Sequence, residues 1–350
     1  MVICIMNFVT LPKLKNGDKV AILSPSFAAP AVWPHVYKLG CQRLRDVFGL
    51  EPIEFPTTRK LGASGEERIK DLVDAFESKD IKAVIASLGG DDQITYIKKL
   101  PREPFINNPK PFFGYSDNTH FINHLWLNGI PSFYGGCLFT EFAMQVKMDE
   151  FTVDYLNHAF FDNGFFDLKS SPTFNDIGLN WNDPSTINTR RKHQQNPFWS
   201  WDSLNNSQGI TWGGCVESID DMLRHGATIP NLNDFKNIVL FLETSEEIPD
   251  HFYFRRVLRA LGERGILSNV QGLLIGRPKA WEFNKQKTDK EKIIYKKAQQ
   301  EMVLEVTRKY NEDIPIIQNI DIGHTAPQIP LPVGKKIKID SSTKSIQMEF

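Results

Sequence analysis

The sequence has few cysteines and no paired cysteine motif. Its 350 residues contain four, which are widely separated: Cys4, Cys41, Cys137 and Cys215. None belongs to a CxxC pair, so neither a zinc knuckle nor a redox motif is indicated. We therefore expect reduced, mostly buried thiols of a cytosolic protein rather than a disulfide scaffold.

An excess of either charge is also absent. The 41 Lys and Arg residues nearly balance the 42 Asp and Glu residues, which leaves a formal charge of −1. A protein without excess positive charge has no general field to hold a polyanion, so a nucleic-acid polymer is not expected as a partner. The remaining composition, 41% hydrophobic and 24% charged, is that of an ordinary globular chain.

Long hydrophobic runs are missing as well. No window offers the roughly 18 uninterrupted apolar residues of a membrane-spanning helix. The apolar stretch in MVICIMNFV has no basic residue before it and no small-residue cleavage site after it, unlike a signal peptide. We therefore predict a cytoplasmic protein that does not contact a membrane.

Two organised regions flank a polar segment. From 17 to 134, apolar runs alternate with amphipathic helical patterns, which predicts an α/β domain with a parallel sheet that binds ligands at the carboxyl ends of its strands. The second region is predicted to be a separate α+β unit, with a ligand cleft between the two. The polar, Trp-rich segment between them is predicted to be a functional loop or linker. We place the boundaries at 1–165, 166–206 and 207–350.

Ser116 follows an apolar strand pattern and precedes a helical one, in KPFFGYSDNTHFINHLWLNG. A serine at a strand-to-helix turn exposes its hydroxyl, and the following N–H groups face any negative charge that develops there. However, Asn118 replaces the second glycine of the GxSxG pattern. Taken alone, the string favours the simpler interpretation that Ser116 or Asp117 caps the helix.

Gly89 and Gly90 end another predicted strand, directly before a predicted helix. Bare backbone at such a point approaches a ligand closely, although Gly-Gly is also a routine turn. The pair lacks the spacing of a dinucleotide or P-loop fingerprint, so nucleotide binding through either motif is excluded.

His324 and Glu243 are the candidate base and its acidic partner. His324 follows the strand pattern IPIIQNI in a loop held by prolines, whereas the other histidines lie in helical patterns or give no signal. A histidine in a rigid loop is well placed for proton transfer, although a loop histidine without a task fits equally. Glu243 ends the apolar run NIVLFL, while Glu246 and Glu247 also fit plain surface charges, and burial would separate them.

A metal site is a competing arrangement of acidic and histidine side chains. It would draw on Asp91, Asp92, Asp117, Glu243 and His324. No HxxxH or HExxH pair supports it, so we do not expect a metal.

The strings ASLGGDD, PFFGYSDNT, SFYGG, GGCVESIDDML, IVLFLETSEE and DIGHT together resemble the LD-carboxypeptidase and microcin C immunity (MccF-like) serine peptidase family. The resemblance extends from about residue 17 to 333. It implies a flavodoxin-like N-terminal domain that carries the nucleophile and a C-terminal domain that carries the Glu and His. It also implies a homodimer that needs no metal or organic cofactor.

The resemblance assigns a role to each candidate. Ser116 would be the nucleophile, His324 the general base and acid, and Glu243 the residue that orients the imidazole. The oxyanion hole would consist of the backbone N–H groups of Gly90 and Asp117. Acyl transfer to serine and then to water is the implied chemistry.

Two branches of the family differ in substrate. MccF-like members hydrolyse the bond between an acidic aminoacyl group and a nucleotide-like moiety, whereas LD-carboxypeptidases release terminal D-alanine from murein tetrapeptides. The Trp-rich segment and the strings GDDQ and ETSEE favour the first branch. A tryptophan over the cleft would stack on a nucleobase, although simple packing of the loop is the alternative. The predicted substrate contacts are Gly89, Trp181, Trp199 and Trp201.

Two reservations accompany the resemblance. Ala326 stands where an acidic residue often follows the His-Thr pair of the family, which puts a substrate contact from that position in doubt. The third functional interpretation is a catalytically silent protein that keeps the cleft to bind a peptide or nucleotide conjugate, because a fold alone does not establish activity.

Overall fold

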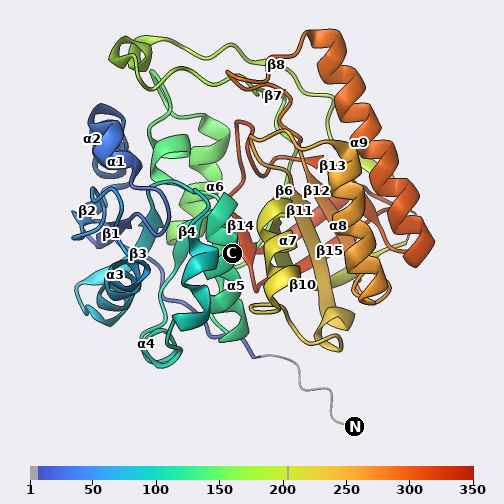
Figure 1. The fold of residues 1–350 in the computed structure, drawn as a ribbon, viewed down its shortest axis with the longest axis horizontal. Helices are drawn as coiled ribbons and strands as arrows, with labels where there is room; N and C mark the ends of the chain where they lie inside the picture. Colours follow the sequence, from blue (N-terminus) through green and yellow to red (C-terminus); the bar gives the residue numbers. More distant parts are fainter. Residues whose placement is uncertain (1–6, 203–204) are drawn as a thin grey trace.

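The first of two large sheets is built mainly from the N-terminal region (Figure 1). A computed structural model describes residues 7–202 and 205–350. The strand order is β14-β5-β4-β3-β1-β2, and the pairs from β5 to β2 are parallel. Five of these strands lie within 17–134, where the sequence predicts apolar strands alternating with helices: β1 (Lys19–Leu23), β2 (Glu51–Glu54), β3 (Ile81–Ala86), β4 (Phe112–Gly114) and β5 (Ser132–Tyr134). The predicted parallel α/β domain is confirmed.

Helices connect these strands and pack on the sheet. They are α1 (Ala29–Val32), α2 (Pro34–Phe48), α3 (Gly65–Glu77), α4 (Glu103–Asn107), α5 (Thr119–Leu127) and α6 (Glu150–Phe161). α3 begins at the capping box that its sequence predicts: the Glu67 N–H donates to Ser64 Oγ, and the Ser64 N–H donates to the Glu67 carboxylate. Its buried face includes Leu72 and Phe76.

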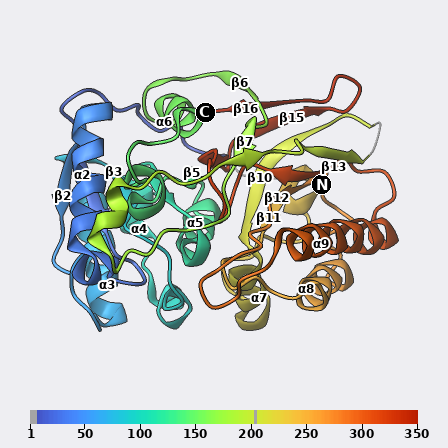
Figure 2. The same ribbon diagram turned by 90° about the horizontal axis from the view of Figure 1, so that it is seen from above.

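The second sheet has eight strands in the order β6-β16-β15-β10-β11-β12-β13-β9. Its parallel centre consists of β10 (Ser207–Cys215), β11 (Ile238–Glu243), β12 (Gly272–Gly276) and β13 (Ile316–Ile320). The antiparallel flanks are β6 (Phe165–Leu168), β9 (Ser200–Asp202), β15 (Lys336–Asp340) and β16 (Ser345–Glu349). The helices α7 (Val216–His225), α8 (His251–Glu263) and α9 (Asp289–Tyr310) lie along one side of this sheet (Figure 2).

Two segments cross between the halves. β14 (Leu331–Val333) lies between β13 and β15 of the second sheet in the sequence but pairs antiparallel with β5 of the first sheet. The predicted linker crosses the top of the molecule in Figure 1 and includes β7 (Thr173–Phe174), the 3-10 helix η5 (Pro184–Asn188) and β8 (Gln194–Gln195). β6 and β9 tie its two ends to the second sheet. The division at 1–165, 166–206 and 207–350 stays a prediction.

The segment after Gly89 and Gly90 differs from the predicted helix. It forms two short 3-10 helices, η1 (Gln93–Thr95) and η2 (Ile97–Lys99). The β-branched residues in QITYI disfavour a regular α-helix, and Pro101 follows closely. The predicted helix is therefore wrong, although the position of the two glycines after β3 is confirmed.

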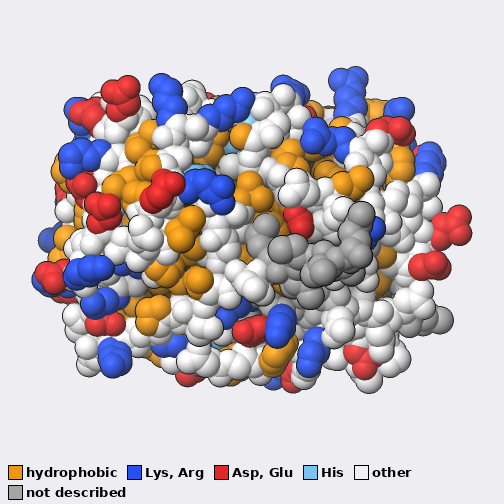
Figure 3. All heavy atoms as spheres, turned by 90° about the horizontal axis from the view of Figure 1, so that it is seen from below, with side chains coloured by type: hydrophobic (Ala, Val, Ile, Leu, Met, Phe, Trp, Pro, Cys, Tyr) orange, Lys and Arg blue, Asp and Glu red, His pale blue; other side chains and the backbone are white. Residues whose placement is uncertain are grey.

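The distribution of surface charges and the state of the cysteines agree with what the composition predicts. On the face shown in Figure 3, acidic and basic side chains are interspersed among the described residues, without a continuous basic area. Cys41, Cys137 and Cys215 are free and buried, as predicted, and Cys4 lies outside the described residues. No helix within 7–202 and 205–350 combines the length and apolar character needed to cross a membrane.

Candidate active site

Ser116 lies at the sharp turn between β4 and α5. Its φ is +63°, a left-handed conformation that costs a non-glycine residue about 1–2 kcal/mol and is typical of functional sites. Neither Ser116 nor Asp117 caps the following helix through its side chain. The Asp117 carboxylate instead accepts the Gln93 N–H at 3.1 Å, and burial raises the pKa of Asp117 to about 6. The helix-cap interpretation is therefore wrong.

The two glycines after β3 lie directly beside this turn. A Cβ at Gly89 would lie 2.9 Å from Ser116 Oγ, so only glycine lets the two segments touch. Gly90 has a φ of +147°, which favours glycine, and a Cβ there would collide with the Ser26 hydroxyl. Within the described part of the chain, neither the Gly90 N–H nor the Asp117 N–H donates to a protein acceptor. Both donors are free for a ligand.

Glu243 and His324 are brought together from the ends of β11 and β13. Glu243 Oε2 lies 2.8 Å from His324 Nδ1. Two glycines make room for this carboxylate, because a Cβ at Gly276 would lie 2.6 Å from the Glu243 Cβ and one at Gly323 would collide with Oε2. Burial separates the candidates as anticipated: Glu243 is fully buried, whereas the Glu246 side chain is 51% exposed.

Tyr134, at the end of β5, joins the serine turn to the glutamate. Its hydroxyl accepts the Ser116 N–H at 3.2 Å and donates to Glu243 Oε1 at 2.5 Å. A continuous path thus runs from the Ser116 backbone through Tyr134 and Glu243 to His324. Sequence reasoning missed this tyrosine, although SFYGG is one of the family-like strings, because nothing in the string indicates where its hydroxyl points.

The Glu246 carboxylate contacts the second ring nitrogen of His324, Nε2. Its Oε2 lies 2.9 Å from Nε2, and within the described residues no hydrogen bond joins His324 to Ser116. Burial lowers the pKa of His324, but the Glu243 and Glu246 carboxylates outweigh it and raise the pKa to about 10. Desolvation by itself raises the pKa of the Glu246 carboxylate. The neighbouring imidazolium outweighs this effect and lowers the pKa of Glu246 to about 2. The imidazole is therefore held in its charged form between two carboxylates.

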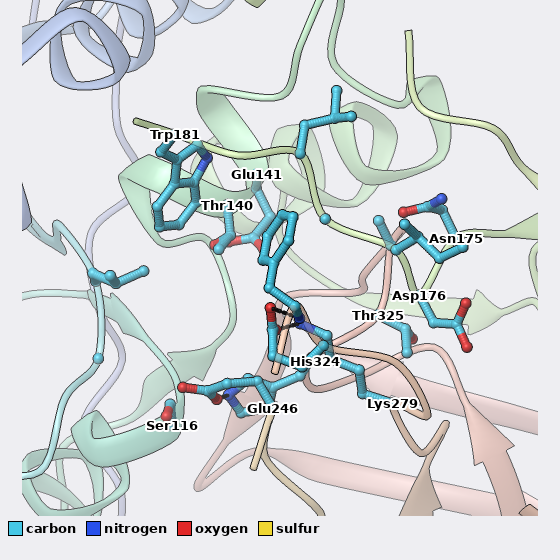
Figure 4. Close-up of a pocket in the computed structure, with 18 of the residues that line it drawn as sticks. Ser116, Thr140, Glu141, Asn175, Asp176, Trp181, Glu246, Lys279, His324 and Thr325 are labelled. Carbon is cyan, nitrogen blue, oxygen red and sulfur yellow. Dashed lines mark hydrogen bonds and ion pairs between the residues drawn. The ribbon is translucent and has the colours of Figure 1, made fainter. Parts of the chain in front are cut away.

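A pocket of about 440 Å³ opens over these residues. In Figure 4, Ser116, Glu246 and His324 gather on one side of it, while Asn175 and Asp176 lie on another. The lining comes from both halves of the molecule and from the crossing segment: Phe27, Trp33, Leu88, Gly89, Gly90, Tyr115, Ser116, Thr140, Glu141, 175–182, Arg191, Glu246, Lys279, Glu282, Phe283, 324–326 and Gln328. The predicted cleft between the two units is present.

Trp181 belongs to an aromatic wall of this pocket. Its ring centroid lies 5.1 Å from that of Trp33, in an edge-to-face arrangement, and Phe27 lines the same pocket. The Trp33 indole N–H donates to Asn182 Oδ1 at 2.8 Å, which fixes the crossing segment to the N-terminal half. Flat aromatic surface of this kind suits a planar ring of a ligand.

Trp199 and Trp201 lie outside the pocket lining. The Trp199 indole N–H donates to Asp321 Oδ2 at 2.8 Å, and Trp201 belongs to β9, where it pairs with Ile317 of β13. Both side chains pack against the hydrophobic core. The packing alternative therefore describes these two tryptophans, and only Trp181 of the three borders the pocket.

Two cationic side chains line the pocket, and they have different partners: Lys279 contacts a carboxylate and Arg191 contacts an amide. Lys279 Nζ lies 2.6 Å from a Glu282 carboxylate oxygen. Arg191 donates through Nε to Gln145 Oε1 at 2.7 Å and has no ion pair within 4 Å among the described residues. Its terminal N–H groups are available to an anion. Glu141, in the same lining, has its pKa raised to about 7 by burial.

The alternative metal site is not assembled. No group of three or more His, Cys, Asp or Glu side chains within 7–202 and 205–350 is arranged to hold a metal ion. Asp92 pairs with Arg68 at 2.6 Å, whereas Glu243 contacts His324.

Comparison with known proteins identifies the family. The LD-carboxypeptidase N-terminal domain matches residues 20–135, and the LD-carboxypeptidase C-terminal domain matches 208–339. The chain belongs to the LD-carboxypeptidase family. As a member of this MccF-like LD-carboxypeptidase family, the protein is an enzyme of the serine-peptidase type.

Full-length relatives agree with this assignment. A putative carboxypeptidase of Treponema pallidum is 27% identical over 346 residues, with 96% of this chain and 94% of the relative covered. An MccF-like protein from Streptococcus pneumoniae, solved in complex with AMP, is 26% identical with a TM-score of 0.81, covering 95% of this chain and 98% of that one. The microcin C7 self-immunity protein MccF of Escherichia coli is 22% identical over 342 residues, 96% of this chain and 94% of its own. This member of the LD-carboxypeptidase family thus shares the two-domain architecture of MccF-like proteins.

Proposed function

We propose that the protein is a serine hydrolase that cleaves the bond between an acidic aminoacyl group and a nucleotide-like moiety. The observation that carries the proposal is the pocket itself, because Ser116 and His324, which Glu243 contacts from behind, border the same cavity as Trp181 and Arg191. A reacting carbonyl at Ser116 thus has aromatic surface and an unpaired cation within one enclosed site.

Each side chain has a task in the proposed reaction. Ser116 Oγ attacks the carbonyl carbon while His324 Nε2 takes the hydroxyl proton, and the same nitrogen then gives that proton to the leaving group. Glu243 stabilises the imidazolium through Nδ1. The free N–H groups of Gly90 and Asp117 hold the developing oxyanion, a contribution of typically about 3–4 kcal/mol per donor. Water attacks the acyl-enzyme and releases Ser116.

The substrate class is argued from the walls of the pocket. The rings of Trp181 and Trp33 suit a nucleobase, and the unpaired guanidinium of Arg191 suits the carboxylate of an acidic side chain. MccF has been solved in complex with aspartyl sulfamoyl adenosine and with glutamyl sulfamoyl guanosine. We propose the same chemical class here. The homodimer and the cytoplasmic location stay predictions.

Release of terminal D-alanine from murein tetrapeptides is the second candidate. A probable murein peptide carboxypeptidase of Bacillus subtilis is 23% identical over 346 residues, and the family name refers to this activity. The same Ser116, His324 and Glu243 would serve both reactions, so the walls of the pocket decide between them.

A direct comparison of substrates tests the proposal. Hydrolysis of aspartyl sulfamoyl adenosine and of an L,D-linked murein tetrapeptide is measured side by side, with Ser116→Ala as the blank. We expect cleavage of the nucleoside conjugate and a loss on the order of 10⁴-fold or more in Ser116→Ala. Ser342→Ala, in the exposed turn between β15 and β16, is the matched control.

The other outcomes separate the alternatives. Release of D-alanine alone would assign the enzyme to the murein branch. Turnover retained in Ser116→Ala would overturn the nucleophile assignment. Absence of turnover, together with a lack of labelling of Ser116 by a serine-directed fluorophosphonate, would favour a silent binding protein.

A further inference from the structure

The turn that carries Glu246 is held in place, whereas the Glu246 side chain is accessible from the pocket. Glu217, which is partly buried, accepts the Ser245 N–H at 3.1 Å and the Ser245 hydroxyl at 2.6 Å through Oε1. The Glu247 N–H donates to Ser245 Oγ at 3.2 Å. The backbone position of Glu246 is thus fixed, while its half-exposed carboxylate lines the cavity.

This carboxylate engages the nitrogen that the reaction requires. In the proposed mechanism, His324 Nε2 has to accept the Ser116 proton, but here Nε2 faces Glu246 at 2.9 Å and Nδ1 faces Glu243 at 2.8 Å. An imidazolium that donates through both nitrogens cannot act as a base. The enzyme as described is therefore in a resting arrangement, and one carboxylate has to leave before Ser116 is activated.

Glu246 rather than Glu243 is the carboxylate that is able to leave. Glu243 is fully buried, and it is fixed by Tyr134 and by the close approach of Gly276 and Gly323. Glu246 has no comparable enclosure, since half of its side chain is exposed. Water and a bound ligand reach it from the pocket.

We propose that Glu246 is a latch that the α-ammonium group of an aminoacyl substrate opens. In the free enzyme the Glu246 carboxylate holds Nε2, and in the complex it pairs with the substrate ammonium instead. An α-ammonium lies one carbon from the carbonyl that Ser116 attacks, so correct placement of the carbonyl brings the cation next to this carboxylate. The inference rests on the proposed function and assigns Glu246 as a positioning and specificity residue.

The proton balance follows from this exchange. When Glu246 turns to the substrate ammonium, the Nε2 proton of His324 leaves to water and the imidazole becomes neutral. Nε2 then accepts the Ser116 proton as the Oγ–carbonyl carbon bond forms. Binding of an aminoacyl substrate should thus release one proton before any bond is cleaved.

Several charged or titratable groups surround the imidazole and contribute to its titration. Glu243 faces Nδ1, Glu246 faces Nε2, and the Tyr115 ring packs edge-on at 4.9 Å. Glu141 from the π-helical turn 138–142 acts on His324 through space, and Lys279 acts on Glu246. Removing the charge of Glu246 leaves the other groups in place and should lower the pKa of His324.

Substitution of the carboxylate by its amide tests the latch. Glu246→Gln is compared with Glu247→Gln, whose side chain is exposed and adjacent in sequence. The first readout is the pH dependence of fluorophosphonate labelling of Ser116 without substrate, which follows the neutral imidazole. We expect the midpoint in Glu246→Gln to fall by at least about one pH unit, and that of Glu247→Gln to match the parent enzyme.

The second readout addresses the ammonium. kcat/KM is measured for aspartyl sulfamoyl adenosine and for its N-acetyl derivative, which lacks the cation. We expect the parent enzyme to prefer the free amine by at least about tenfold and Glu246→Gln to lose most of this preference. Glu246→Ala serves as a second variant, and a thermal melt verifies folding of each protein.

The outcomes distinguish failure of the latch from failure of the proposed function. If Ser116 of the parent enzyme is not labelled at any pH, the serine-hydrolase proposal itself fails. If Ser116 is labelled but Glu246→Gln leaves the midpoint unchanged, the latch is overturned while the proposed function stands. A shifted midpoint with an unchanged preference for the free amine would overturn the role of the ammonium.

Discussion

At the scale of single residues, the site depends on a chain of buried polar contacts. Tyr134 has no exposed surface, and its hydroxyl is shared between the Ser116 N–H and the Glu243 carboxylate. A buried carboxylate that loses a donor is left partly unpaired, at a cost of about 1–3 kcal/mol. Such a loss affects both the orientation of His324 and the backbone of the strained serine turn.

We expect Tyr134→Phe to lower kcat about 10- to 100-fold while KM changes little, because the tyrosine touches Glu243 and the Ser116 backbone rather than the pocket. Steady-state kinetics on the substrate that the parent enzyme cleaves gives both constants. Tyr155→Phe is the matched control, since its hydroxyl also makes two hydrogen bonds, to the Asp167 carbonyl and from the Lys169 N–H, away from the site. Equal kcat values for the two variants would contradict the positioning role.

At the scale of elements, the crossing segment provides Trp181 to the pocket and also holds neighbouring loops in place through hydrogen bonds. Its residue Asn175 exchanges backbone hydrogen bonds with Ala326, at 2.7 and 2.9 Å, so the loop of His324 and the pocket wall are held together. Ala326 thus supports the pocket wall through its backbone. Trp199 anchors the other end of the segment on Asp321.

We expect Trp181→Ala to raise KM for aspartyl sulfamoyl adenosine by about tenfold, because stacking on a base is worth about 1–3 kcal/mol, and to affect a murein tetrapeptide less. Trp199→Phe removes the hydrogen bond to Asp321 and should lower the melting temperature without changing the ratio of the two activities. Steady-state kinetics on both substrates, together with thermal melts of both variants, tests these two expectations. An equal loss on both substrates in Trp181→Ala would remove the nucleobase role.

The elements that sequence reasoning identified share a continuous apolar run or a cap. The runs KVAIL and IVLFLE predict β1 and β11, and Ser64 with Glu67 predicts the start of α3. β14 carries no such signal, because it has three residues and one is proline. Glu246 was not separable from a surface charge, since its distance from His324 depends on how the ends of β11 and β13 meet. Nor does the sequence indicate that Trp199 turns to Asp321.

At the scale of the whole molecule, contacts between the two halves are buried and polar as well as apolar. The Trp126 indole N–H of α5 donates to the Thr211 carbonyl of β10 at 3.1 Å, and the Asn123 amide donates to the Gly213 carbonyl at 3.1 Å. The Thr211 hydroxyl donates to the Pro332 carbonyl of β14 at 2.6 Å. Separation of the halves would leave these groups unpaired and would expose both sheets.

We therefore expect the two halves to unfold in one cooperative transition, although a chain of this length often unfolds in steps. Phe113→Ala in the first sheet and Leu274→Ala in the second each remove a fully buried side chain, at a cost of about 2–5 kcal/mol. Both should lower the same melting temperature, with the calorimetric enthalpy equal to the van't Hoff enthalpy. Two transitions, each shifted by only one of the variants, would contradict this coupling. In that case the pocket would lie between units that fold independently, and β14 would be too weak a connection to hold His324 opposite Ser116.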